Sequence, residues 1–179
     1  MVDTPSYNRR SIRLKGYDYA SPGAYFVTIV SYRREPTFGK IIGGKLTLSR
    51  IGRLAKYCLE QIPHHHRNVK LDEYVIMPNH IHGILVIEEN RHNVSVGAGY
   101  KPALKSCTLP EIIRNFKTSS ATKINRLRES PGVPVWQRNY YERIVRNDKE
   151  LDLIREYINS NAINWRTDIY CFKNKTGQM

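Results

Sequence analysis

Short apolar runs along the chain predict three strands, at residues 24–31, 70–77 and 80–87. The first run is rich in β-branched and aromatic residues and follows the turn residues Pro22 and Gly23. Only Pro78 and Asn79 separate the second run from the third, so these two runs predict an antiparallel hairpin. Residues 133–145 predict one further extended segment.

Apolar residues recur every three or four positions in three other segments, which predict helices at about 49–61, 109–127 and 147–161. Gly43 and Gly44 predict a turn before the first helix, and Pro63 is expected to stop that helix. The last helix has a clear start. Asn147 is a favourable N-cap, and Glu150 follows three residues later, as in a variant of the capping box.

The order of these elements is strand, helix, hairpin, helix, extended segment and helix. It predicts an α+β fold of the ferredoxin-like (RRM-like) type, an antiparallel sheet with packed helices whose C-terminal helix carries a tyrosine. A length of 179 residues fits one domain. Residues 1–20 are polar and basic and are interpreted as an arm, and residues 89–107 have the composition of a surface loop.

The charge balance narrows the possible partners. The chain has 29 Lys and Arg against 16 Asp and Glu, a net charge of +13, which favours a polyanionic partner such as nucleic acid over an anionic membrane surface. No apolar run approaches the roughly 20 residues of a membrane span, and the first residues do not resemble a secretory signal. The three cysteines form no Cys-x-x-Cys pair, which predicts reduced thiols in a cytoplasmic protein. The lack of a membrane span predicts no membrane partner.

His80 and His82 form the first candidate site. Residues i and i+2 of a strand point to the same face, so both imidazoles can bind one metal ion, whereas Ile81 points into the core. An isolated His-x-His pair is commonly two ordinary polar residues on a solvent-exposed face. Here the pair begins a strand in apolar sequence, where burial of two unpartnered imidazoles is costly, and this favours metal ligands.

Tyr157 and Asn161 form the second candidate site, because residues i and i+4 share one face of a helix. A tyrosine beside apolar helix residues is commonly a core-edge aromatic, but a phenol is also a competent nucleophile on phosphorus when its proton is removed. The amide of Asn161 could complete the coordination of a metal ion beside the two histidines. Tyr140 and Tyr141 are rival nucleophiles in the extended segment, where aromatic residues are usually packed or stacked.

Two other histidine features carry little weight. The run His64–His66 follows Pro63 at a helix end and is interpreted as a solvated turn. His92 lies in the polar loop and has no further signal.

Two stretches together resemble a known family. Tyr74-Val-Ile-Met-Pro-Asn-His-Ile-His-Gly-Ile-Leu85 resembles the His-hydrophobic-His segment of the IS200-like, single-tyrosine (HUH) transposases. Val135-Trp-Gln-Arg-Asn-Tyr-Tyr-Glu-Arg-Ile-Val-Arg-Asn147, continuing to Glu156-Tyr-Ile-Asn-Ser-Asn161, is similar to the REP-associated tyrosine transposase branch. The resemblance implies three parts, a basic N-terminal arm at 1–20, an IS200-like transposase catalytic domain at 21–165 and a C-terminal tail at 166–179.

By this resemblance, Tyr157 is the nucleophile, and a divalent metal ion, Mg²⁺ or Mn²⁺, is bound by His80, His82 and Asn161. The implied mechanism is an in-line attack that cleaves DNA, leaving a 5′-phosphotyrosine link and a 3′-hydroxyl that later rejoins the strand. Two imidazoles and an amide oxygen suit Mn²⁺, whereas Mg²⁺ prefers more oxygen ligands. Ala162 replaces the proline that commonly follows the third ligand, which is expected to change only how the helix ends.

The implied partner is single-stranded DNA with a hairpin, a REP-like or insertion-sequence end, bound by a monomer or homodimer. Basic side chains are expected to contact its phosphates, and the arm, where Arg and Tyr alternate, suits stacking on unpaired bases. The alternative for the basic residues of the 109–127 helix is an ordinary solvated face. The candidate DNA contacts are Arg9, Arg10, Arg13, Arg114, Lys117, Lys123, Arg138 and Arg143.

Two other functions stay open at this point. A four-stranded α+β sheet with basic helices is also typical of a non-catalytic, single-stranded nucleic-acid-binding module. A metal phosphoesterase could use His80 and His82 with a water nucleophile, and would not need Tyr157.

Overall fold

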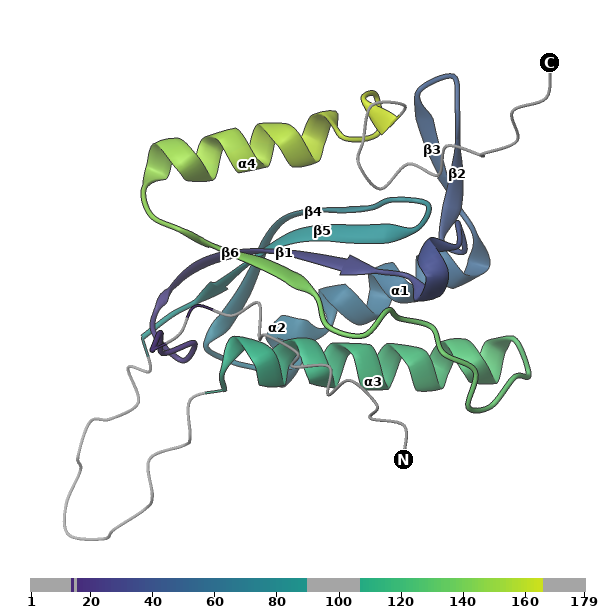
Figure 1. Cartoon of the computed structure of the whole chain (residues 1–179), viewed down its shortest axis with the longest axis horizontal. Coiled ribbons are helices and arrows are strands. Elements are labelled where there is room, and N and C mark those ends of the chain that lie inside the picture. The colour runs from purple at the N-terminus through teal and green to yellow at the C-terminus, as the bar shows by residue number, and fades with distance from the viewer. Residues whose placement is uncertain (1–13, 15, 90–106, 166–179) are drawn as a thin grey trace, which may run out of the picture.

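The computed structural model describes residues 14, 16–89 and 107–165 and contains one four-stranded antiparallel sheet (Figure 1). The strand order in that sheet is β4-β5-β1-β6. Apart from one small hairpin, the chain order of strands and helices is that of the ferredoxin-like fold, which confirms the predicted α+β class. The strands are β1 (Gly23–Val30), β4 (Val69–Ile76), β5 (His80–Ile87) and β6 (Tyr141–Val145).

Helices cover both faces of the sheet (Figure 1). The helices α1 (Arg50–Glu60), α2 (Ile62–His65) and α3 (Leu109–Leu127) lie on one face, and α4 (Asp148–Ser160) lies on the other. Alternate residues of β1 and β5 therefore serve different layers: Tyr25 and Leu85 pack toward α1 and α3, whereas Phe26 and Ile84 pack toward α4.

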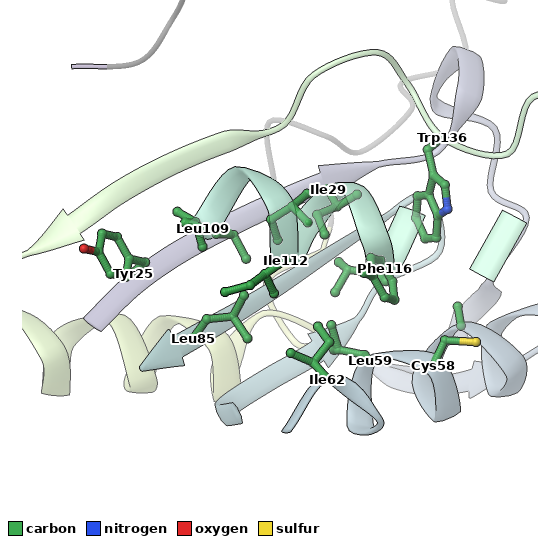
Figure 2. Packing of buried hydrophobic residues seen from close by; sticks show 14 of the residues in the cluster. Tyr25, Ile29, Cys58, Leu59, Ile62, Leu85, Leu109, Ile112, Phe116 and Trp136 are labelled. Atoms are coloured by element: carbon green, nitrogen blue, oxygen red, sulfur yellow. The ribbon is translucent and has the colours of Figure 1, made fainter. Parts of the chain in front are cut away.

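The main core lies between the sheet, α1 and α3 (Figure 2). Ile29, Leu59, Ile112 and Phe116 are almost completely buried there, and Trp136 donates from Nε1 to the buried Ser120 Oγ at 3.0 Å. Burial of each large apolar side chain contributes roughly 1.5–3 kcal/mol. This layer therefore contributes most of the free energy of folding, and it holds in place the sheet on whose opposite face α4 packs.

The layer beneath α4 is much smaller. Its buried apolar residues are Phe26, Ile84, Ile154 and Ile158. The predicted start of α4 is confirmed, since Asn147 Oδ1 accepts from the Glu150 amide at 2.9 Å. The Glu150 carboxylate, however, accepts from the Arg146 amide and not from the Asn147 amide, so the expected capping box is not closed.

The structure also contains a second, two-stranded sheet, which the sequence did not predict. The hairpin β2 (Gly39–Ile42) and β3 (Lys45–Leu48) turns at Gly43 and Gly44, both at positive φ, so the predicted turn is present but joins two strands. A Cβ on Gly52 of α1 would lie 1.9 Å from the Phe38 carbonyl oxygen. The absence of a side chain at Gly52 therefore allows the base of the hairpin to pack on α1.

Two local expectations were wrong. Pro63 does not end the first helix, which stops at Glu60, but lies in the first turn of α2, where a missing N–H costs nothing. The run His64–His66 is not entirely solvated, because His66 is buried and burial lowers its pKa. The extended segment 133–145 forms a strand only at its end, with an isolated bridge from Trp136 to Ser31 before it.

The predicted arm is described only at residues 14 and 16–20. There Tyr19 is buried, its carbonyl accepts from the Leu109 amide, and the Tyr17 and Tyr25 hydroxyls lie 3.1 Å apart. Those residues lie on the protein body. Residues 1–13 and 15, most of the predicted loop and the predicted tail lie outside the described residues. In the described part of the chain, no helix is both long enough and apolar enough to cross a membrane.

Candidate active site

His80 and His82 lie on the α4 face of β5, and both side chains are buried. Their Nε2 atoms are 3.0 Å apart, so the two imidazole edges converge on one point. Ile81, between them, is buried in the opposite layer. The strand alternation that predicted two co-facial imidazoles is therefore present, although both rings are buried rather than exposed.

Asn79 determines the protonation of His80. The Asn79 Nδ2 donates to the Arg34 carbonyl at 3.1 Å, which directs Oδ1 toward His80 Nδ1 at 2.9 Å. Because Oδ1 can only accept, His80 carries its proton on Nδ1 and presents a lone pair at Nε2. Burial lowers the pKa of His80 to about 3, so the ring is neutral at ordinary pH.

His82 is held from the neighbouring strand. Thr28 of β1 lies opposite His82, and its Oγ1 is 2.9 Å from Nδ1. Phe26 stacks on the same imidazole at a ring separation of 5.3 Å. These contacts fix the orientation of His82 and direct its Nε2 toward His80 and α4.

Tyr157 of α4 completes the convergence. Its hydroxyl is 3.2 Å from His82 Nε2, and its ring meets Phe26 edge-on. Tyr157 as a whole is 42% exposed, although its ring packs against Phe26 and His82. Asn161, one turn further along at the C-cap of α4, is buried.

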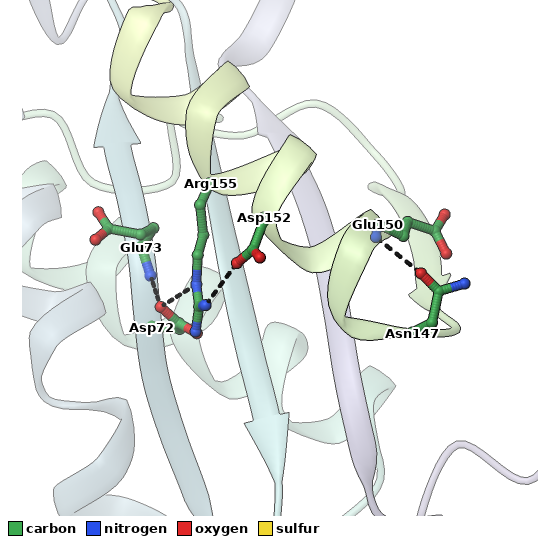
Figure 3. Close-up of polar contacts among 6 residues, drawn as sticks. All are labelled: Asp72, Glu73, Asn147, Glu150, Asp152 and Arg155. Carbon is green, nitrogen blue, oxygen red and sulfur yellow. Dashed lines mark hydrogen bonds and ion pairs between the residues drawn. The ribbon is translucent and has the colours of Figure 1, made fainter.

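A bulge in β4 ties α4 to the sheet (Figure 3). The pairing of β4 with β5 shifts between Leu71 and Tyr74, and the Asp72 carboxylate accepts from the Glu73 amide within this bulge. Arg155 donates to both Asp72 oxygens, at 3.3 Å from Nε and 2.6 Å from Nη2. Arg155 also pairs with Asp152 one turn earlier in α4. Sequence reasoning missed this tether, since Asp72 and Arg155 are far apart in the chain.

The residues fit a divalent metal ion. Two nitrogen ligands about 2.1 Å from one ion, at right angles, lie about 3.0 Å apart, as the two Nε2 atoms do. Within residues 14, 16–89 and 107–165, no cluster of three or more His, Cys, Asp or Glu side chains could hold a metal ion. Asn161, the third ligand that the sequence suggests, is buried at the C-cap of α4.

Comparisons with known proteins found two similar sequences and a solved structure with a similar fold. No family model matches the chain. An uncharacterized Haemophilus influenzae protein is 41% identical over 171 residues, covering 90% of this chain and 92% of that protein. A second Haemophilus influenzae protein, provisionally named a REP-associated tyrosine transposase, is 27% identical over 148 residues, covering 82% of this chain and 73% of its own.

The fold has a solved counterpart, described as a REP-associated tyrosine transposase bound to a REP hairpin. It is 15% identical, has a TM-score of 0.56 and covers 87% of this chain and 74% of its own. The chain is thus similar in sequence to one protein named as a REP-associated tyrosine transposase and similar in fold to another. The family resemblance of the two sequence stretches is thereby confirmed.

The rival tyrosines are separated by the sheet. Tyr141 is exposed and pairs with Thr28, so it shares the face of His82 and Tyr157. Tyr140 is half-buried and packs against the main core, on the other side. The hydroxyl that lies 3.2 Å from His82 Nε2 is that of Tyr157.

The predicted basic residues of α3 lie on the layer away from the tyrosine helix (Figure 1). Arg114 is exposed there, and Lys123 lies over the Tyr57 ring at 5.3 Å. Lys117 donates to the carbonyls of Gln137 and Asn139, at 2.6 and 2.8 Å, so it holds the segment before β6.

The remaining predicted contacts are divided between β6, the segment before it and the arm. Arg143 of β6 lies on the face of the active site and forms an ion pair with Glu150 at 2.6 Å. Arg138 is exposed. Arg9, Arg10 and Arg13 lie outside the described residues.

Proposed function

We propose that the chain cleaves and rejoins single-stranded DNA at hairpin-containing sites through a covalent Tyr157 intermediate. One observation carries the proposal. The Tyr157 hydroxyl lies 3.2 Å from a histidine nitrogen that is itself 3.0 Å from the second histidine. A structural tyrosine at the edge of a core needs no such alignment with two buried imidazoles.

The reaction balances without an external energy source. The Tyr157 oxygen attacks phosphorus in line, the bond from phosphorus to the 3′-oxygen breaks, and a 5′-phosphotyrosine link forms. The phenol loses one proton and the released 3′-hydroxyl gains one. Because the tyrosyl ester conserves the phosphodiester energy, attack by a 3′-hydroxyl on that link reverses the step and rejoins a strand.

The histidines provide the second part of the proposed site. His80 and His82, with Asn161, would hold a divalent ion, Mg²⁺ or Mn²⁺, whose charge stabilises the developing negative charge on phosphate oxygens. Asn79 and Thr28 hold both rings in orientation before any ligand arrives. This preorganisation lowers the reorganisation that binding would otherwise require.

The proposed substrate rests on charge and on relatives. A net charge of +13 suits phosphate contacts, and the fold neighbour is described as bound to a REP hairpin. The site forms within one chain, because Tyr157 and His82 belong to the same polypeptide. We therefore propose that a monomer suffices for cleavage.

The test is a denaturing gel with end-labelled single-stranded hairpin DNA and Mg²⁺ or Mn²⁺. The wild-type chain is expected to form a denaturant-resistant adduct, and Tyr157→Phe is expected to form none while binding the DNA normally. Tyr141→Phe, on the same face, is the matched control and should keep the adduct. An adduct formed by Tyr157→Phe would assign another nucleophile, and cleavage by Tyr157→Phe without any adduct would favour a water-based phosphoesterase.

A further inference from the structure

A shallow cleft of about 620 Å³ lies between the hairpin β2–β3 and the turn before His80. Its lining includes Pro36, Lys40, Leu48, Pro78 and Trp165. The hairpin stands at the end of the sheet where α4 ends (Figure 1). The cleft is fixed to the active-site strand, because the Phe38 amide donates to the Pro78 carbonyl at 2.9 Å.

The cleft is continuous with the candidate active site through one aromatic side chain. Trp165 lines the cleft and also stacks on His80, with a ring separation of 5.9 Å and an interplanar angle of 27°. Trp165 is only half-buried, so part of its indole is open to a ligand. A planar group bound in the cleft would therefore lie beside the imidazole pair.

The surface around the cleft is strongly basic. Residues 32–53 contain a single acidic residue, Glu35, and six basic residues, all of them exposed: Arg33, Arg34, Lys40, Lys45, Arg50 and Arg53. The basic residues of α3, by contrast, lie on the other face of the sheet from Tyr157. The hairpin segment therefore supplies cationic side chains at the end of the sheet where α4 ends, in addition to Arg143 on the face of Tyr157.

We infer that this cleft binds one unpaired nucleotide of the DNA strand next to the cleavage point, with its base on Trp165 and its phosphate near Lys40. The inference rests on the proposed function. Three features of the cleft support it: the indole of Trp165 is partly exposed, the walls are formed by proline and leucine side chains, and basic side chains lie nearby. Single-stranded nucleic acid is recognised by such stacking surfaces, which accept any base because every base has a flat π-face.

The test uses the full chain with Tyr157→Phe, which separates binding from cleavage, and a six-nucleotide single strand without a hairpin. The chain has two tryptophans, and Trp136 is buried. The oligonucleotide is expected to quench emission in this chain and not in the same chain carrying Trp165→Leu. Affinity should fall roughly tenfold in the Trp165→Leu chain, as for loss of one stacked base.

A charge-matched pair of variants tests the phosphate contact. Lys40→Ala should remove one phosphate contact. The slope of log affinity against log salt concentration should therefore become shallower by about 0.7, the value for one contact to a single strand. Lys149→Ala, exposed at the far end of α4, should leave the slope unchanged. Equal slopes for both variants, or unchanged Trp165 emission with intact binding, overturn the inference. That result leaves the Tyr157 adduct unaffected, whereas absence of the adduct in the wild-type chain overturns the proposed function itself.

Discussion

At the scale of single residues, the geometry of the candidate site depends on groups outside the histidine pair and Tyr157. His80 presents a lone pair because Asn79 accepts its Nδ1 proton, and Asn79 is oriented in turn by the Arg34 carbonyl. The chain of hydrogen bonds runs from an exposed 3₁₀ turn into the buried site. His80 is therefore neutral because it is buried, and its tautomer is set by the hydrogen bond to Asn79.

We expect Asn79→Ala to slow adduct formation by roughly 10- to 100-fold, because loss of such an outer partner loosens the imidazole. The buried Nδ1 donor would also lose its acceptor, at a cost of about 1–3 kcal/mol of stability. Adduct rate and urea unfolding measure the two effects. Asn79→Asp retains an acceptor and should recover part of the rate. A wild-type rate in Asn79→Ala would show that Asn79 does not set the tautomer.

Lys117 gives a test of pH dependence. Burial lowers the pKa of Lys117 to about 8, although its ammonium donates to two carbonyls. Between pH 8 and 10.5 the unfolded chain holds more of this proton than the folded chain, so stability from this group rises with pH. We expect the difference in free energy of unfolding between wild type and Lys117→Met to increase from pH 7.5 to 9.5. Parallel pH profiles in urea unfolding would contradict this.

The residue scale also shows what sequence reasoning can reach. The spacing of His80 and His82 predicts a shared face, since strand alternation is a local rule. Thr28 was not predicted as a partner of His82, because the two residues meet only through strand pairing. Local patterns identify which side chains project together, but not what lies opposite them.

At the scale of elements, α4 determines where the tyrosine lies, and it is attached by few contacts. Among the residues that the structure describes, four buried apolar side chains form the layer beneath it, and the Arg155–Asp72 pair provides a directional link to β4. The bulge in β4 adds one residue to the strand, and this change of register turns the Asp72 carboxylate toward Arg155 of α4. We interpret this pair as a positioning device for Tyr157.

We expect Arg155→Met to lower the rate of adduct formation about 10- to 100-fold with little change in DNA affinity, because a small displacement of a nucleophile is costly. Asp72→Asn should behave similarly, and the double variant should be no worse than either single variant. Asp152→Asn, at the exposed end of the same network, is the control and should have little effect. A change in DNA affinity without a change in rate would contradict a positioning role.

The hairpin β2–β3 shows why some elements escape prediction. Each of its strands has four residues, half of them exposed, and the Gly43–Gly44 turn is equally compatible with a loop before a helix. What stabilises the hairpin is tertiary, namely the close approach of Phe38 to Gly52 of α1. The longer elements α1, α3 and β5 were predicted with nearly correct bounds, because each carries a full amphipathic or apolar pattern.

At the scale of the whole molecule, the sheet separates the main hydrophobic core from the candidate active site. The face covered by α1 and α3 holds the main core, whereas the face covered by α4 holds the histidine pair and Tyr157. Because the small layer alone lies over the site, variants in that layer can alter catalysis without unfolding the domain. This division follows from alternation along β1 and β5, where successive residues serve opposite layers.

The same arrangement determines whether two chains must cooperate. Tyr157 reaches His82 of its own chain, so every folded chain holds both halves of the proposed site. We therefore expect a mixture of Tyr157→Phe and His82→Ala chains to form no adduct on labelled hairpin DNA, since neither chain has a complete site. If tyrosine helices were exchanged between chains, the mixture would regain activity, because some sites would pair an intact tyrosine with an intact histidine. Wild type diluted with the double variant Tyr157→Phe, His82→Ala should lose activity linearly, whereas exchange within a dimer would leave mixed dimers without a complete site and give a curved loss.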